Sequence, residues 1–557
     1  MPLSASASHA SRGARLGVLV VPLIAIGCGG TGEGSSREVT EVSAARLEEH
    51  IRYLASDRLA GRGTGTPGYD SAARYVVEHY ARLGLDSAGT EGYLQPISFR
   101  RARALEGSSV VLFGKSGRRT LAPYRDYVPS PNFFDPKAEV TAPLVFAGFG
   151  VTAPERGYDD YRGVDAKGKI VVLLTGGPPS FPSAERAHYA TSRSKRENAV
   201  RRGAVGLLVV RTRDQSFPWG RLVRQSRGGD MRWLDSTGAP TDVSPALRGV
   251  ATLSDSAAAY LFQGAPSSLS EVLTAAEAGT PRAFDLPGRA SLRTVSVHDR
   301  LESANVAGLL HGSDPILREE VVVYTAHLDH LGVGEPVQGD SIYNGAFDNA
   351  SGVAAMLEVA RAFSSLTTPP RRSMLFLAVT AEEKGLLGSD YFAEHPTVPI
   401  ERIVANVNLD GLAILYPFRE MVALGAEHST LGSTVARLAG RQNVTLAPDP
   451  FPQEVFFIRS DQYSFVRRGV PSVFPFMGMA SDSGVDAAAR FKEWLATRYH
   501  LPQDDVGQPM DLEAGARQAQ LEFLVGLEIA NADERPAWKE GDFFGRTFGR
   551  DRRDGAP

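Results

Sequence analysis

The sequence predicts an α/β protein with a mainly parallel sheet, helices on both faces of that sheet, and an inserted β-rich domain. Two observations predict the sheet. From Asn305 onward, short apolar runs alternate with segments of helical apolar spacing, a pattern typical of strands that are each followed by a helix. The apolar runs are also nearly uninterrupted, as in strands buried on both faces. The insert is indicated by a change between residues 98 and 297, where short β-like runs are divided by Gly and Pro.

Composition narrows the class of protein. The chain has 557 residues, which predicts two or three domains, and its 43% hydrophobic and 22% charged residues are typical of a globular protein. The net charge is −4 and no run of Lys or Arg forms a basic stripe, so we expect no nucleic-acid partner. Cys28 is the one cysteine, which excludes an internal disulfide.

The N-terminus has the pattern of a secretory signal. Arg12 and Arg15 precede the apolar run 16–26, which is shorter than the roughly 20 residues that a membrane-spanning helix needs. The run closes with Ala-Ile-Gly-Cys28, which resembles a bacterial lipoprotein signal, in which the chain is cut before a cysteine that is then lipidated. An ordinary cleaved signal with an incidental cysteine is the alternative. Both predict an extracytoplasmic protein, and the first adds a lipid anchor at Cys28 as its one membrane attachment.

The expected organisation follows the chain in order. Residues 1–28 are a signal peptide, 29–40 a polar tether, 41–125 the first part of the main domain, 126–295 the insert, 296–535 the second part of the main domain, and 536–557 a mobile tail. The first part begins with helices at 44–54 and 72–83, separated by a Gly-rich loop at 56–68. This loop lacks the Lys-Ser/Thr ending of a phosphate-binding loop, so a structural turn is predicted.

The insert is expected to be rich in strands. In and just before it, apolar runs predict strands at 109–113, 144–146, 170–174 and 205–210. A helix at 195–202 followed by a turn and the last of these strands resembles the protease-associated domain of secreted peptidases. No chemistry is assigned to the insert.

The second part of the main domain alternates strand and helix. Strands are predicted at 321–325, 374–379, 403–409 and 470–476, and helices at 350–366 and 431–439. His327 follows the first strand, Glu382 and Glu383 follow the second, and Asp410 follows the third. Because the carboxyl ends of parallel strands meet at one edge of a sheet, these side chains are expected to converge.

Histidines and carboxylates in one pocket suit a hydrolytic zinc site. Peptide hydrolysis needs an activated water, a polarised carbonyl and a proton relay, and a pair of metal ions supplies the first two. Zinc accepts histidine and carboxylate ligands together. In such a site one carboxylate bridges the metals, and another stays off them to carry the proton.

These motifs resemble the co-catalytic di-zinc aminopeptidase family of secreted bacterial and vacuolar enzymes, over residues 47–530 with the insert between. The resemblance implies that His327 and Asp410 bind one zinc, that Glu383 and His500 bind the other, and that Asp348 bridges the two. It implies that Glu382 is the general acid/base.

The resemblance also implies roles for residues around the metals. Asp329 would hold the His327 ring through its second nitrogen, and Asp348-Asn349 would carry a cis peptide bond. Ser460 and Asp461 resemble a family segment near the cleft and receive a weak substrate-side role. Phe347 stands where relatives often have Asp, and His330 is expected to be structural or on the surface.

The function expected from this resemblance is a metallo-aminopeptidase acting on peptides with two zinc ions per chain. Two alternatives of the same fold are a carboxypeptidase or dipeptidase, against which the lack of a paired-arginine pattern argues, and a single-metal glutaminyl cyclase. A different class is a non-catalytic, peptide-binding receptor. Such a relative should have lost ligands or the base, whereas this sequence has the full set.

Overall fold

The second half of the chain builds a sheet whose central strands are parallel. In this computed structural model, which describes residues 41–549 except 116, 214–217, 453–454 and 482, the strand order is β17 (Ser373–Val379), β14 (Val321–His327), β18 (Ile403–Asn408) and β21 (Ser472–Met477), each parallel to its neighbour. Antiparallel strands β13 (Phe284–Leu310) and β2 (Leu94–Ala104) continue the sheet beyond β17. The mainly parallel α/β fold expected from the sequence is confirmed.

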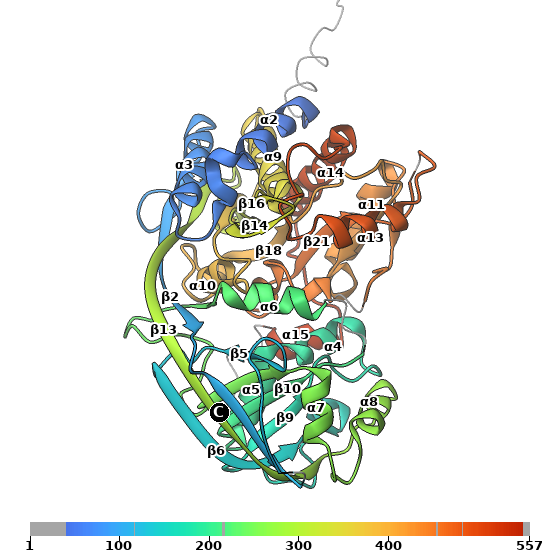
Figure 1. Cartoon of the computed structure of the whole chain (residues 1–557). Helices are drawn as coiled ribbons and strands as arrows, with labels where there is room; N and C mark the ends of the chain where they lie inside the picture. The colour runs from blue at the N-terminus through green and yellow to red at the C-terminus, as the bar shows by residue number, and fades with distance from the viewer. Residues whose placement is uncertain (1–40, 116, 214–217, 453–454, 482, 550–557) are drawn as a thin grey trace, which may run out of the picture. The chain divides into compact units, whose positions relative to one another are not determined.

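Helices cover both faces of this sheet, because its central strands are apolar on both sides (Figure 1). All seven residues of β14 are buried. Its side chains alternate between a cluster shared with α2 (Ala44–Leu54), α3 (Pro67–Arg82), α9 (Gly352–Ser364) and α14 (Leu512–Asn531), and a cluster shared with Phe392 and Phe465. The last two residues belong to α10 (Leu387–Glu394) and α12 (Gln462–Val466).

The insert forms a second sheet with its own core. The parallel strands β6 (Lys137–Phe146), β9 (Ile170–Leu174), β10 (Gly206–Val210) and β12 (Gly249–Leu253) lie in this order, and β5 (Tyr127–Ser130) pairs antiparallel with β12. Its helices are α4 (Ser183–Ala190), α5 (Ser192–Arg201), α6 (Trp219–Arg227), α7 (Asp255–Leu261) and α8 (Leu269–Glu277).

One strand belongs to both sheets. The N-terminal half of β13 pairs with β6 and β3 (Ser109–Gly114), and its C-terminal half pairs with β2 and β17. The expected boundary at residue 295 therefore falls inside a continuous strand, which Figure 1 shows as one long ribbon.

The C-terminal residues differ from the expected mobile tail. Phe543–Phe548 form α15, and Phe543 and Phe544 are buried in a cluster that contains side chains of both the insert and the main domain. The expectation of mobility was wrong for residues 536–549. It relied on the Gly and charged residues of this segment, whereas the buried aromatic side chains of α15 hold the segment in place. The signal peptide, the tether and Cys28 lie outside the described residues. No helix within the described ranges is long and apolar enough to cross a membrane.

Candidate metal centre

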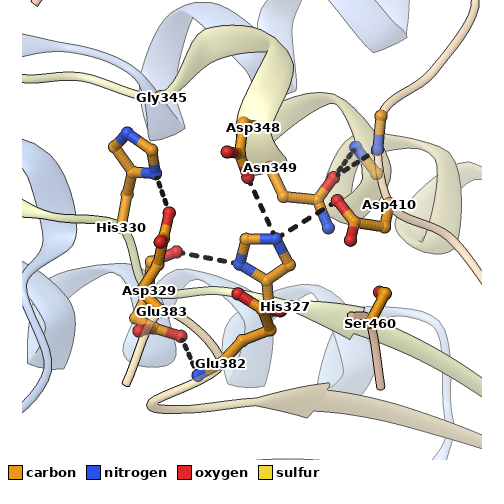
Figure 2. A network of polar contacts seen from close by, with 12 residues as sticks. His327, Asp329, His330, Gly345, Asp348, Asn349, Glu382, Glu383, Asp410 and Ser460 are labelled. Carbon is orange, nitrogen blue, oxygen red and sulfur yellow. Dashed lines mark hydrogen bonds and ion pairs between the residues drawn. The ribbon is translucent and has the colours of Figure 1, made fainter. Parts of the chain in front are cut away.

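Four of the five predicted ligands, all but His500, lie together at the carboxyl end of the parallel strands (Figure 2). His327 is the last residue of β14, Glu382 and Glu383 follow β17, and Asp410 follows β18. Asp348 lies in the irregular turn Ala346–Ser351 that leads into α9. Parallel strands place these residues at one edge of the sheet, as expected from the sequence.

Asp348 stands between two histidines. Its Oδ1 lies 3.1 Å from His327 Nε2, and its Oδ2 lies 3.2 Å from His500 Nε2. Asp410 Oδ1 is 3.3 Å from His327 Nε2, and Glu383 Oε2 is 3.2 Å from His500 Nε2. The five residues expected to hold metal thus meet in one place, with the two oxygens of Asp348 turned to different halves of the cluster.

His330 also belongs to this cluster. Its side chain is fully buried, and Nδ1 lies 2.7 Å from Glu383 Oε1. Two groups of side chains could each hold an ion: His327, Asp348 and Asp410, and His330, Asp348 and Glu383. The sequence predicted a structural or a surface histidine at this position, and the burial of His330 excludes the surface position. Its place in the run His327-Leu-Asp-His330 was the available signal.

Asp329 contacts His327 through a different atom from the one expected. His327 Nδ1 lies 3.1 Å from the main-chain oxygen of Asp329, so the ring is held by a carbonyl and not by the carboxylate. The carboxylate instead accepts hydrogen bonds from the main-chain N–H of Glu382 and from Thr64 Oγ1, both at 3.0 Å. Asp329 therefore links the ends of β14 and β17.

Arg62 connects the loops that carry the ligands, and sequence reasoning missed it. Its side chain is 1% exposed, and its guanidinium donates to the carbonyls of Leu54, Leu328, Asn344 and Gly345. Burial lowers its pKa to about 10, so it remains charged at neutral pH. The Gly-rich loop at 56–68 has the structural role that was expected, and Arg62 is its main contact with the site.

The main chain around Asp348 is held by hydrogen bonds. The N–H groups of Phe347 and Asp348 each donate to the Asp504 carboxylate at 3.0 Å. Asn349 Oδ1 accepts from Gly352 and Gly411. The expected cis peptide bond between Asp348 and Asn349 is present. These contacts fix the direction of the central carboxylate.

The electrostatics of the cluster fit bound cations. Burial raises the pKa of Glu382 well above its usual value, and burial also raises the pKa of Glu383. His330 Nε2 and His500 Nδ1 are buried and have no hydrogen-bond partner among the described residues. A buried excess of carboxylates with unsatisfied ligand atoms is costly unless positive charge is supplied. The mixed histidine and carboxylate donor set suits zinc.

Ser460 and Asp461 lie beside the cluster. Ser460 Oγ accepts a hydrogen bond from Asn408 Nδ2 at 2.7 Å, and Ser460 lines the cleft described below. Asp461 is fully buried, and burial raises its pKa to about 7. Asp461 is not among the residues that line this cleft.

A cleft of about 1250 Å³ opens over the cluster. It is lined by carboxylates of the cluster, by aromatic side chains that include Phe491 and Trp494 of α13 (Ala487–Thr497), and by residues of the insert. Residues that line it include Asp348, Glu382, Glu383, Asp410, Phe347, Phe456, Phe476, Phe491, Trp494, Arg193, Arg221 and Arg232. Such a concave, mixed surface is typical of a binding site for a small organic molecule or a peptide end.

Comparison with known proteins finds similar sequences. Residues 305–522 match the sequence profile described as Peptidase family M28. The chain is 25% identical over 430 residues to Aminopeptidase NAALADL1 of Mus musculus, covering 66% of this chain and 53% of that protein, so it spans about half the length of this relative. It is 25% identical over 508 residues to Probable lipoprotein aminopeptidase LpqL of Mycobacterium tuberculosis, covering 88% and 85%.

A solved structure shares the fold. The aminopeptidase from Aneurinibacillus sp. strain AM-1 superposes with a TM-score of 0.53 and 19% identity, covering 91% of this chain and 99% of that one. Residues 305–522 thus match peptidase family M28, and the fold of the chain is similar to that of a bacterial aminopeptidase.

Proposed function

We propose that the protein is a secreted metallo-aminopeptidase that removes N-terminal residues from peptides with two zinc ions and Glu382 as general base. The observation that carries the proposal is the approach of both Asp348 oxygens to different histidines, His327 and His500. The relatives named aminopeptidase support the choice of reaction.

In this proposal His327 and Asp410 hold one zinc, Glu383 and His500 hold the other, and Asp348 bridges them. The short distances from His327 to Asp410 and from His500 to Glu383 support this division. When bound, the zinc pair would polarise the scissile carbonyl and lower the pKa of an attacking water. The Asp348 carboxylate would thus be shared by the two metal positions.

Glu382 is the group proposed to take the proton from the water and pass it to the leaving amine. Its main-chain N–H donates to the Asp329 carboxylate, which fixes the start of its side chain beside the ligands. It forms none of the ion pairs that join the cluster within the described part of the chain. Its carboxylate therefore remains available for proton transfer, whereas Glu383 is engaged by His330 and His500.

We propose an extracytoplasmic location with a lipid anchor at Cys28. The sequence before Cys28 and the name of the mycobacterial relative, a probable lipoprotein aminopeptidase, support this location. Residues 126–295 are proposed to be a protease-associated domain, and their contribution to the cleft supports a part in substrate selection.

The test is Glu382→Ala, with the exposed Glu534→Ala as the control. Glu382→Ala should keep two metal ions per chain by elemental analysis and lose hydrolysis of aminoacyl anilides by orders of magnitude, while the control keeps both. Retained turnover in Glu382→Ala would overturn the assignment of the base. Cleavage of N-blocked peptides but not of free aminoacyl substrates would instead support the carboxypeptidase alternative.

A further inference from the structure

His500 is supported differently from the other proposed metal ligands. The other four lie at the ends of strands or in the turn before α9, whereas His500 lies in the turn that follows α13. Its φ is +57°, in the left-handed region that residues other than glycine seldom adopt. Its Nδ1 has no hydrogen-bond partner in the described part of the chain, whereas His327 Nδ1 lies 3.1 Å from the main-chain oxygen of Asp329. Apart from the carboxylates at Nε2, the orientation of the His500 ring therefore depends on the side chains packed against it.

A row of aromatic rings links His500 to the residue before Asp348. The centroid of the His500 ring lies 3.9 Å from that of Tyr499, which lies 5.5 Å from that of Trp494. The Trp494 ring in turn lies 4.4 Å from the ring of Phe347. Because Asp348 Oδ2 lies 3.2 Å from His500 Nε2, the row closes a loop of contacts around this half of the cluster.

Trp494 is the centre of this row and is held from two sides. It is 4% exposed, and its main-chain oxygen accepts a hydrogen bond from the N–H of Tyr499 at 3.1 Å, at the end of α13. On the other side, the Phe347 ring packs directly on Gly411, where an added Cβ would lie 2.6 Å from Phe347 Cε1. The indole is therefore enclosed between the end of α13 and the turn that carries Phe347.

We propose that Trp494 is a positioning residue for the metal centre, which holds the His500 ring through Tyr499 with Nε2 toward the carboxylates of the cluster. This inference rests on the proposed function, in which His500 binds one of two zinc ions. Without the indole, the His500 ring loses the packing that keeps it in this orientation. The zinc ion at His500 is then bound more weakly, and the other zinc ion is not affected.

The experiment measures the affinities of the two zinc ions by competition with a chromophoric chelator, in the full-length wild type and in Trp494→Leu. One affinity should fall by about 10–100-fold, the usual effect of losing a group that orients a metal ligand, and the other should not change. Trp494→Phe keeps an aromatic ring and should recover part of the lost affinity. The matched control is Trp233→Leu, the same change at a tryptophan that is 6% exposed and whose ring contacts are with Tyr391 and His395. This control should keep both affinities.

A double-mutant comparison tests whether Trp494 acts through His500. His500→Ala removes the ligand and should leave one tightly bound zinc ion. Adding Trp494→Leu to His500→Ala should not weaken that ion, and a further loss would mean that Trp494 supports the whole cluster and does not act through His500. If Trp494→Leu does not fold, Phe347→Leu removes the ring on the other side of the indole and should weaken the same zinc ion.

The outcomes separate this inference from the proposed function. Two affinities that are unchanged in Trp494→Leu, or that fall equally, would overturn the positioning role and leave the proposed aminopeptidase standing. Loss of one zinc ion in Trp494→Leu, in a protein whose wild type hydrolyses no aminoacyl substrate, would support the positioning role and contradict the proposed function. A wild type that binds fewer than two zinc ions would overturn both.

Discussion

Replacing Arg62 by Met tests whether one buried cation organises the metal centre. The four carbonyls that Arg62 reaches belong to the end of α2, to the loop after β14 and to the approach to Asp348. Methionine fills much of the same volume but leaves these four buried acceptors without their donor. At about 1 kcal/mol each, the low end for an unsatisfied buried group, the loss is ~4 kcal/mol of unfolding free energy. The free energy of unfolding of a typical domain is about 5–15 kcal/mol, so the variant should still fold but with much lower stability.

Arg372→Met is the matched control for this experiment. Arg372 is also fully buried, and it binds Glu320 and the carbonyls of Ile529 and Ala532. It precedes β17 and therefore lies at the edge of the sheet opposite the metal ligands. Both variants should lose stability in a urea titration, whereas only Arg62→Met should also lose zinc in elemental analysis and turnover with an aminoacyl anilide. If Arg62→Met binds zinc and hydrolyses the substrate as well as Arg372→Met does, Arg62 does not position the site.

Three other perturbations have expected outcomes. Glu522 is fully buried in α14, and burial raises its pKa from 4.5 to about 8, so the stability that its protonated form contributes is complete below pH 4.5 and is lost as pH rises toward 8. At pH 8 the variant Glu522→Gln should therefore be more stable than the wild type. An equal or lower urea midpoint for the variant at pH 8 would contradict this. Removal of zinc with a chelator should lower the unfolding temperature measured by calorimetry, and readdition should restore it. A metal at 100 times its Kd adds ~2.7 kcal/mol per site to the free energy of unfolding. An unfolding temperature that does not change would argue against a metal bound by the folded state. Phe544→Ala should cost ~3 kcal/mol of unfolding free energy because this ring is buried, and the half-buried Phe548→Ala should cost less; similar values in urea titrations would mean that α15 is not part of the core.

The parallel strands were predictable because each is a continuous apolar run. The strands expected at 321–325, 374–379, 403–409 and 470–476 agree with β14, β17, β18 and β21 to within two residues at each end. β13 was not predicted as one element. Its 27 residues contain Pro287 and Gly288 at a point where the pairing register shifts, and these residues indicate a break in a sequence pattern.

The convergence of the ligands was predictable for the same reason, since His327, Glu383 and Asp410 follow strands whose carboxyl ends must meet. The atoms that support them were not. Whether Asp329 holds His327 by its carboxylate or its carbonyl depends on how a loop turns after β14, and apolar periodicity carries no information on that. No sequence motif marks Arg62 as part of the site, because it binds main-chain carbonyls of residues that are far away in the sequence.

The shared strand β13 has a consequence for how such a protein can be altered. Because the same backbone donates and accepts hydrogen bonds in both sheets, the inserted region is not a cassette that can be cut out or exchanged between its two junctions. Deleting it would strip half of a 27-residue ribbon of its neighbours and expose an open edge that invites self-association. Exchanging the insert for a different domain would thus require a donor strand matched in pairing register on both sides.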